Sequence, residues 1–218
     1  MGHNKEAKHS AITAFFDDAE ARLAFLDQLT ESGHEREAMT LSLVYIDRNA
    51  QALCWPSDSA GRNFVDALIR FGREPLMGLA YPTLAALTFA SMAPLWKAIA
   101  AEITNAFPGP SYELMPVPSF EKAIANHISA SQLAKLRPEL WRTTVANAVY
   151  RHLRNPAIHG VGTGGGLYFS KTEWNGQPAP IIGFAILRNC ARGLVAESRH
   201  RSEMNYQWFG NDAIVGLA

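Results

Sequence analysis

The chain has little of what marks a secreted, disulfide-bonded or strongly charged protein. Its 218 residues include two cysteines, Cys54 and Cys190, which lie far apart and form no CxxC pair. This pattern fits a reduced, cytoplasmic protein better than a disulfide scaffold or a zinc site. The 20 basic residues are balanced by 20 acidic ones. A protein that coats nucleic acid through its overall positive charge is therefore excluded, and any contact with RNA must come from local patches.

Long apolar segments are also scarce. Residues 1–10 are polar and lack the apolar stretch of a secretory signal, and we expect them to form a mobile arm. Residues 75–96 carry no charge over a length that could cross a bilayer. However, this run contains Gly78, Pro82 and Pro94, and no basic cluster flanks it. We therefore interpret it as a turn and a buried helix and expect no contact with a membrane.

The spacing of apolar residues predicts a mostly α fold in a single domain, residues 1–218, without repeats. Apolar side chains recur three and four residues apart, and glycine or proline separates the segments. The predicted helices cover residues 12–29, 34–53, 61–71 (with caps offered by 57–59), 83–107 (with a kink at Pro94), 119–127 (capped by Ser119), 132–136, 138–153 and 190–204. The helix over 34–53 is apolar nearly all round, which is typical of the centre of a bundle.

The character of the sequence changes at Gly160. Residues 160–166 contain five glycines and formally match GxGxxG. A dinucleotide-binding loop needs a strand before it and a helix after it, whereas here a helix precedes and a strand follows. We interpret the run as a loop that borders a site. Strands over 167–171 and 179–187 flank a turn at 174–178, which predicts a β-hairpin inserted over residues 167–187.

The sequence Arg154-Asn155-Pro156-Ala157-Ile158-His159-Gly160 is the strongest candidate for a site. Pro156 disfavours helical geometry at the residue before it, so the helix should end near Arg154. An arginine offers a planar fork of donors suited to phosphate, and a histidine can give or take a proton near neutral pH. Together they suit metal-free chemistry on a phosphodiester. The alternative is that Arg154 caps its own helix and His159 is a loop residue.

The segment 150–160 resembles the signature motif of the HEPN superfamily, and residues 37–47, which end in Ile46-Asp47, resemble a long apolar helix common in the same superfamily. These all-helical domains occur in RNases of toxin–antitoxin, CRISPR and abortive-infection systems. The resemblance implies a HEPN-like up-and-down helical bundle. Some HEPN toxins carry a tyrosine two residues after the histidine, where a nucleotide is attached to inactivate them. Val161 occupies that position here, which gives no support to that kind of antitoxin control.

The resemblance also implies roles for individual residues. His159 would activate the ribose 2′-hydroxyl or protonate the leaving oxygen, Arg154 would hold the scissile phosphate, and Asn155 would orient this pair or the phosphate. We further expect RNA contacts from Arg151 and, on the helix over 190–204, from two arginines for which a solvated helix face is the alternative: Arg192 and Arg199. His34, His127 and His152 have no metal-ligand spacing and are interpreted as helix-surface residues.

These observations predict a metal-independent endoribonuclease, without cofactors, that cuts single-stranded RNA through attack by the 2′-hydroxyl group. The resemblance implies a homodimer in which two motifs form one composite site, a toxin or defence role, and regulation by an antitoxin or another partner. One alternative is a HEPN-like module that binds RNA or nucleotide, or dimerises, without cutting. Another is a helical structural protein in which the motif match is accidental.

Overall fold

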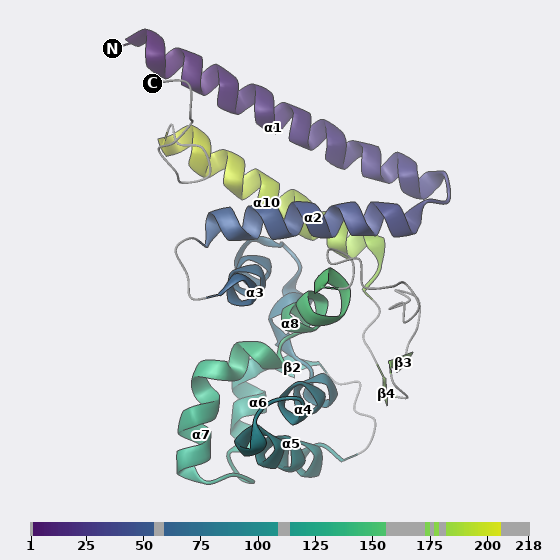
Figure 1. The fold of residues 1–218 in the computed structure, drawn as a ribbon, viewed down its shortest axis with the longest axis vertical. Helices are drawn as coiled ribbons and strands as arrows, with labels where there is room; N and C mark the ends of the chain where they lie inside the picture. Colours follow the sequence, from purple (N-terminus) through teal and green to yellow (C-terminus); the bar gives the residue numbers. More distant parts are fainter. Residues whose placement is uncertain are drawn as a thin grey trace. The chain divides into compact units, whose positions relative to one another are not determined.

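The computed structural model describes residues 2–54, 59–108, 114–155, 173–174, 177–178 and 182–205. These residues are mostly helical, with short antiparallel strand pairs (Figure 1). The predicted mostly α fold class is thereby confirmed, whereas its likeness to HEPN domains stays a prediction. The chain divides into two compact units: a first unit of Met1–Glu74 with Phe184–Ala218, and a second unit of Pro75–Gly183. Among the described helices, none combines the length and the apolar character needed to cross a membrane.

The first unit is built from both ends of the chain. Its helices are α1 (Gly2–Glu31), α2 (Glu35–Leu53), α3 (Ala60–Phe71) and α10 (Phe184–Asn205). Gly33 joins α1 to α2 with a φ of 84°, a backbone conformation that glycine adopts readily. The C-terminal helix α10 packs against α1, α2 and α3. The core of the first unit is formed by large apolar side chains that are almost fully buried, including Ile12, Phe16, Leu23, Leu26, Leu43, Ile46, Phe64, Leu68, Leu187 and Leu194.

The second unit has shorter elements around a separate core. In chain order they are η1 (Pro75–Gly78), β1 (Leu79–Ala80), α4 (Pro82–Ala90), α5 (Pro94–Ala106), β2 (Met115–Pro116), α6 (Val117–Ile124), α7 (Ala130–Leu136), η2 (Arg137–Thr143), α8 (Val145–Val149), η3 (Tyr150–Arg154), β3 (Glu173–Trp174) and β4 (Gln177–Pro178). Strand β1 pairs with β2, with Leu79 opposite Pro116. The core contains Phe89, Ile99, Ile103, Phe120, Ile124 and Leu136.

Several predicted boundaries are close to those observed. The helices expected over 34–53, 61–71, 132–136 and 190–204 correspond to α2, α3, α7 and α10. Ser59 caps α3 by accepting a hydrogen bond from the N–H of Arg62 at 3.2 Å, as the cluster of small polar residues suggested. Residues 2–10, expected to form a mobile arm, are instead the first turns of α1. Their polarity was misleading, because lysine, glutamate and alanine favour helix even where they bury no core face.

Three other predicted helices need correction. The helix expected over 83–107 is divided into α4 and α5, because Pro94 begins a new helix at its first turn instead of kinking one. The helix expected to be capped by Ser119 begins earlier, at Val117, with Pro116 at its N-cap. The helix expected over 138–153 consists of η2, α8 and η3, because Thr144 adopts an extended conformation (φ −79°, ψ 156°) between the first two.

The inserted hairpin is confirmed only around its turn. Strands β3 and β4 pair antiparallel, with Trp174 opposite Gln177, on either side of Asn175-Gly176. The strand predicted over 179–187 is wrong at its end, because Phe184–Asn205 is helical. A short apolar run fits a buried helix as well as a strand, so its pattern could not decide. Residues 167–171 and 179–181 lie outside the described part of the chain.

Part of the apolar surface of helix α2 is exposed to solvent. Its buried face includes Leu43 and Ile46, but Leu41 and Val44 remain 40% and 44% exposed. The sequence predicted a position at the centre of a bundle, and the exposure of these two side chains shows that α2 is not enclosed on every side. In the first unit α2 contacts α1, α3 and α10, and one stripe of its surface is left uncovered.

We predict that Gly193→Ala destabilises the first unit. A Cβ atom at Gly193 would lie 2.2 Å from the backbone oxygen of Phe71, so α10 could approach the end of α3 only by displacing backbone. Overpacking of this kind costs about 2 kcal/mol. Gly183→Ala is the matched control, because no atom lies within 4 Å of its added Cβ. Urea unfolding measures both, and equal midpoints for Gly193→Ala and the wild type would contradict the prediction.

Candidate functional site

The motif begins in an unusual turn of helix. Thr144 caps α8 through its side chain, which accepts a hydrogen bond from the N–H of Asn147 at 3.3 Å. The chain then widens into the π-helix η3, and the N–H of Asn155 donates to the carbonyl of Tyr150, five residues back. Single π turns are rare and occur frequently at functional sites. Here the turn carries Arg154 at its last position.

The contacts of Arg154 include two within its own segment. The residue is only 9% exposed. Its Nη1 atom donates a hydrogen bond to Oδ1 of Asn155 at 3.0 Å, and its Cζ atom lies 5.3 Å from the ring centroid of Tyr150. An arginine remains charged when it is buried, so the aromatic face and the amide oxygen help to offset its lost hydration. The structure thus shows a contact between the side chains of Arg154 and Asn155, while the roles expected of them in a site stay a prediction.

His159 lies outside the described residues, as do the glycine-rich run 160–166 and Val161. The pairing of His159 with Arg154 therefore stays a prediction.

Arg151 points to a different neighbour. It is half-buried, and its Nη2 atom donates to Oγ of Ser91, at the end of α4, at 3.1 Å. Burial lowers the pKa of Arg151, and the charge of Arg142 lowers it further. Arg142 itself donates to the carboxylate of Glu139, and its Cζ atom lies 4.3 Å from the ring centroid of Trp141. Of these two arginines, Arg142 is paired with a carboxylate, that of Glu139, whereas Arg151 is bonded to a hydroxyl.

His152 is neutral at physiological pH. Burial lowers its pKa from 6.5 to about 4, and the charge of Arg151 contributes in the same direction. The sequence interpretation was a helix-surface residue, and in the structure the residue is partly buried. A neutral imidazole beside the motif can exchange one donor and one acceptor with its surroundings without adding charge.

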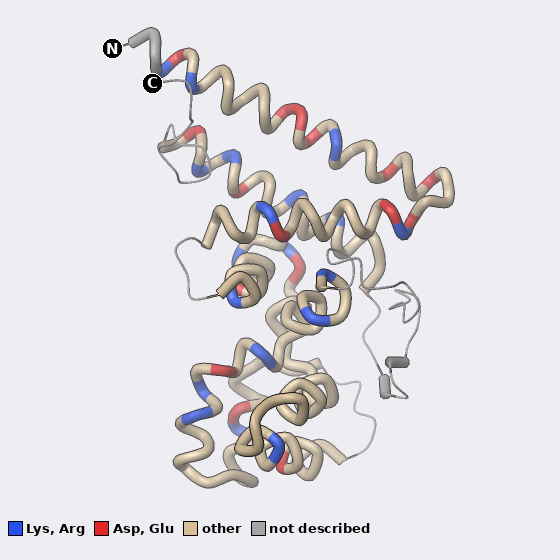
Figure 2. Tube along the Cα trace, viewed as in Figure 1, with Lys and Arg blue, Asp and Glu red and all other residues tan. Residues whose placement is uncertain are grey.

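Arg192 and Arg199 belong to the first unit, where carboxylates neutralise them. Arg192 pairs with Asp27 at 2.9 Å. Arg199 pairs with Asp17 at 2.9 Å, with Glu20 at 3.1 Å and with Glu203 at 2.9 Å. Figure 2 shows acidic positions along α1 and basic positions along α10. The pairs with Asp17, Glu20 and Asp27 join the two helices, and the pair with Glu203 lies within α10. Together they favour a structural role over the predicted RNA contact.

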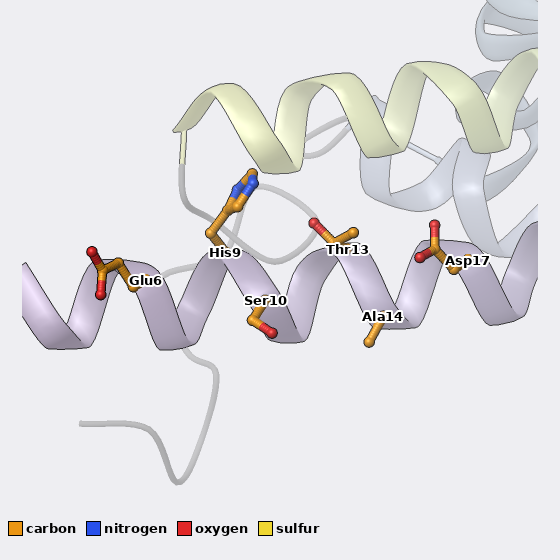
Figure 3. A pocket seen from close by; sticks show the side chains of 6 residues that line it. All are labelled: Glu6, His9, Ser10, Thr13, Ala14 and Asp17. Carbon is orange, nitrogen blue, oxygen red and sulfur yellow. The ribbon is translucent and has the colours of Figure 1, made fainter.

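Other parts of the described structure offer weaker sites. An open hollow on the first unit is lined by α1 residues, of which His9, Thr13 and Asp17 point toward α10 (Figure 3). It includes none of the residues of the motif. Burial raises the pKa of Cys190 to about 12, and burial also raises that of Cys54, so both remain thiols. In the parts of the chain that the structure describes, His, Cys, Asp and Glu form no group of three or more suited to a metal.

The structure adds two residues that the sequence interpretation missed. Tyr150 precedes Arg154 by four positions, a helical spacing that could have signalled contact between their side chains. Ser91 is 60 residues from Arg151, and no sequence pattern connects the two.

Comparison of the chain with protein-family models, curated proteins and solved structures finds no match.

We predict that His152 makes folding stability depend on pH. Because its pKa is about 4 in the folded protein and 6.5 when unperturbed, the unfolded chain binds a proton first as pH falls. The contribution of the neutral ring is complete above about pH 6.5 and is lost progressively down to about pH 4. Urea unfolding across this range should show a steeper loss for the wild type than for His152→Gln.

His127→Gln is the matched control for this measurement, because His127 is an exposed histidine of the same unit. Its pH dependence should follow that of the wild type. A wild-type and a His152→Gln chain that lose stability in parallel on acidification would contradict the assignment.

Proposed function

We propose that this protein is a metal-independent endoribonuclease of the HEPN kind, which cuts single-stranded RNA by attack of a ribose 2′-hydroxyl group. The observation that carries the proposal is the placement of Arg154. A nearly buried guanidinium is oriented by Asn155 and Tyr150 at the end of the turn that leads directly into the segment with His159. Such a pre-oriented cation is suited to stabilise charge that develops on a phosphate.

The chemistry requires one proton transfer at each end of the reaction. The 2′-oxygen attacks phosphorus while its proton passes to a base, and the bond from phosphorus to the 5′-oxygen breaks as that oxygen receives a proton. We assign one of these transfers to His159, since its imidazole is the proton carrier of the motif. Arg154 would hold the non-bridging oxygens, and Asn155 would maintain its orientation. The products would be a 2′,3′-cyclic phosphate and a 5′-hydroxyl.

In this proposal two copies of the chain join their motifs in one composite site. The dimer, a toxin or defence role, and control by an antitoxin or another partner all follow from the HEPN resemblance of residues 150–160. Arg151 adds positive charge three residues before Arg154, which supports RNA as the substrate class.

A module that binds RNA or nucleotide without cutting is the second candidate. It is favoured by the low exposure of Arg154, 9%, because a guanidinium engaged by its own helix could serve to stabilise that helix end. In that case Arg151 would still attract phosphate, and loss of His159 would not change what the protein does to RNA.

We predict that His159→Ala lowers RNA cleavage by at least about 100-fold, the usual loss when a general acid or base is removed. The assay uses single-stranded RNA with a chelator present, and gels that separate cyclic phosphate from linear phosphate ends. His127→Ala, which removes an exposed histidine of the same unit, should leave the rate unchanged. Cleavage that survives in His159→Ala would contradict the catalytic assignment, and absence of cleavage by the wild type would favour the binding module.

We predict a smaller effect from Tyr150. Tyr150→Leu removes the aromatic face next to Arg154 and should lower kcat about tenfold, which corresponds to an interaction of roughly 1.4 kcal/mol. Tyr150→Phe keeps the ring and should retain most of the activity. Single-turnover cleavage and melting temperatures of both variants separate catalysis from folding. If Tyr150→Leu cuts RNA as fast as the wild type, the ring does not position Arg154.

A further inference from the structure

Arg151 is a half-buried cation whose partner is a neutral oxygen. Its Nη2 atom donates to Oγ of Ser91 at 3.1 Å, and within the described part of the chain no carboxylate forms an ion pair with it. By contrast, Arg192 and Arg199 are each paired with acidic side chains. Withdrawing a cation from water without an opposite charge is unfavourable, so the surroundings of Arg151 favour binding of an anion.

Arg142 adds to the same imbalance. Its Nε atom donates to Glu139, and its guanidinium lies over the ring of Trp141, 4.3 Å from the centroid. Counting the formal charges of Glu139, Arg142 and Arg151 as −1, +1 and +1 leaves one uncompensated positive charge. Arg142 and Arg151 are close enough for the charge of the first to lower the pKa of the second, although burial is the larger cause.

Ser91 orients Arg151 and does not itself offer a proton to a ligand. Its hydroxyl donates to the carbonyl of Thr88 at 2.7 Å, which leaves the lone pairs of Oγ for Arg151. The residue is exposed at the end of α4, so the region is open to solvent. The bond to Ser91 uses one of the five N–H donors of the guanidinium, and the planar fork can present further donors to a phosphate.

We propose that Arg151 binds one phosphodiester group of single-stranded RNA, with Ser91 as the positioning residue for Arg151 and with Arg142 adding positive charge to its surroundings. A bound phosphate would offset both the burial of Arg151 and the repulsion between the two guanidinium groups. The choice of RNA as the source of the phosphate rests on the proposed function, whereas the binding of a phosphate group rests on the contacts above. The competing role for Arg151 is to stabilise the carbonyl end of α4, where Ser91 is the C-cap.

The test measures RNA affinity by fluorescence anisotropy as sodium chloride is raised. It uses the full chain carrying His159→Ala, so that the labelled RNA stays intact. Arg151→Gln in this background should bind roughly tenfold more weakly, and the slope of log Kd against log salt should fall by about 0.7, the value for one phosphate contact on a single strand. Arg151→Lys should restore the slope but not the full affinity, because it keeps the charge and loses the fork.

Two further variants serve as comparison and control. Ser91→Ala should weaken binding less than Arg151→Gln and should leave the salt slope unchanged, because it removes no charge. Arg70→Gln removes the same charge from an exposed position on α3, and it should change neither the affinity nor the slope. A slope that falls equally in Arg70→Gln and Arg151→Gln would overturn the proposal.

Inorganic phosphate, added at constant ionic strength, distinguishes the two sources of the ligand. Displacement of RNA only from chains that contain Arg151 shows that the site takes a phosphate group from either source. If free phosphate does not displace RNA, and Arg151→Gln still lowers the slope of log Kd against log salt, the site requires the nucleic-acid backbone. Either result supports the phosphate contact.

The remaining outcomes separate this proposal from that of an RNase. If the wild type cuts RNA but Arg151→Gln keeps the affinity and the slope, the phosphate contact is overturned and the nuclease stands. A lower melting temperature in that same variant would show that Arg151 stabilises the carbonyl end of α4 instead. If the wild type does not cut RNA and Arg151→Gln shows the reduced slope, the nuclease fails and the phosphate contact stands. No RNA binding by any chain overturns both.

Discussion

A guanidinium group that leaves water needs a partner, and the partners of the arginines distinguish the parts of this molecule. Arg188 and Arg192 share Asp27, each at 2.9 Å. Arg199 forms ion pairs with carboxylates of α1 and of its own helix. These contacts give α10 its polar connection to α1, beside the apolar core that the two helices share with α2. Arginines whose charge is neutralised by carboxylates in this way have a structural role.

Arg151, near the motif, has a different kind of partner. Its side chain donates a hydrogen bond to the hydroxyl of Ser91. A hydroxyl does not neutralise a positive charge, so Arg151 can still attract an anion. The difference between carboxylate partners and neutral partners, more than the number of arginines, separates candidate RNA contacts from structural ion pairs in a chain without net charge. It also explains why composition alone could not locate them.

Local signals in the sequence were sufficient for many helices and insufficient for the site. Gly33 and Ser59 mark helix boundaries through backbone freedom and capping, which are properties of single residues, and these boundaries were predicted well. The helix before the motif was predicted as continuous because its apolar spacing is regular. The extended backbone of Thr144 and the π turn at Tyr150 depend on hydrogen-bond choices that periodicity does not encode. Contacts between distant segments, such as that of Ser91 with Arg151, could not be predicted without the fold.

The motif lies in a unit that is inserted, in the sequence, between two helices of the other unit. The first unit is closed by α10, which returns from the far end of the chain to pack on α1, α2 and α3. The close approach of Gly193 to Phe71 makes that packing sensitive to small changes. The second unit is inserted between α3 and α10 and has its own buried core around Phe89 and Phe120. Because the motif helix belongs to the inserted unit, substitutions that tune Arg151 or Arg154 need not disturb the core of the first unit. The arginines of α10 are paired with carboxylates, whereas Arg151 of η3 is bonded to a hydroxyl and is the cation that we assign to phosphate binding.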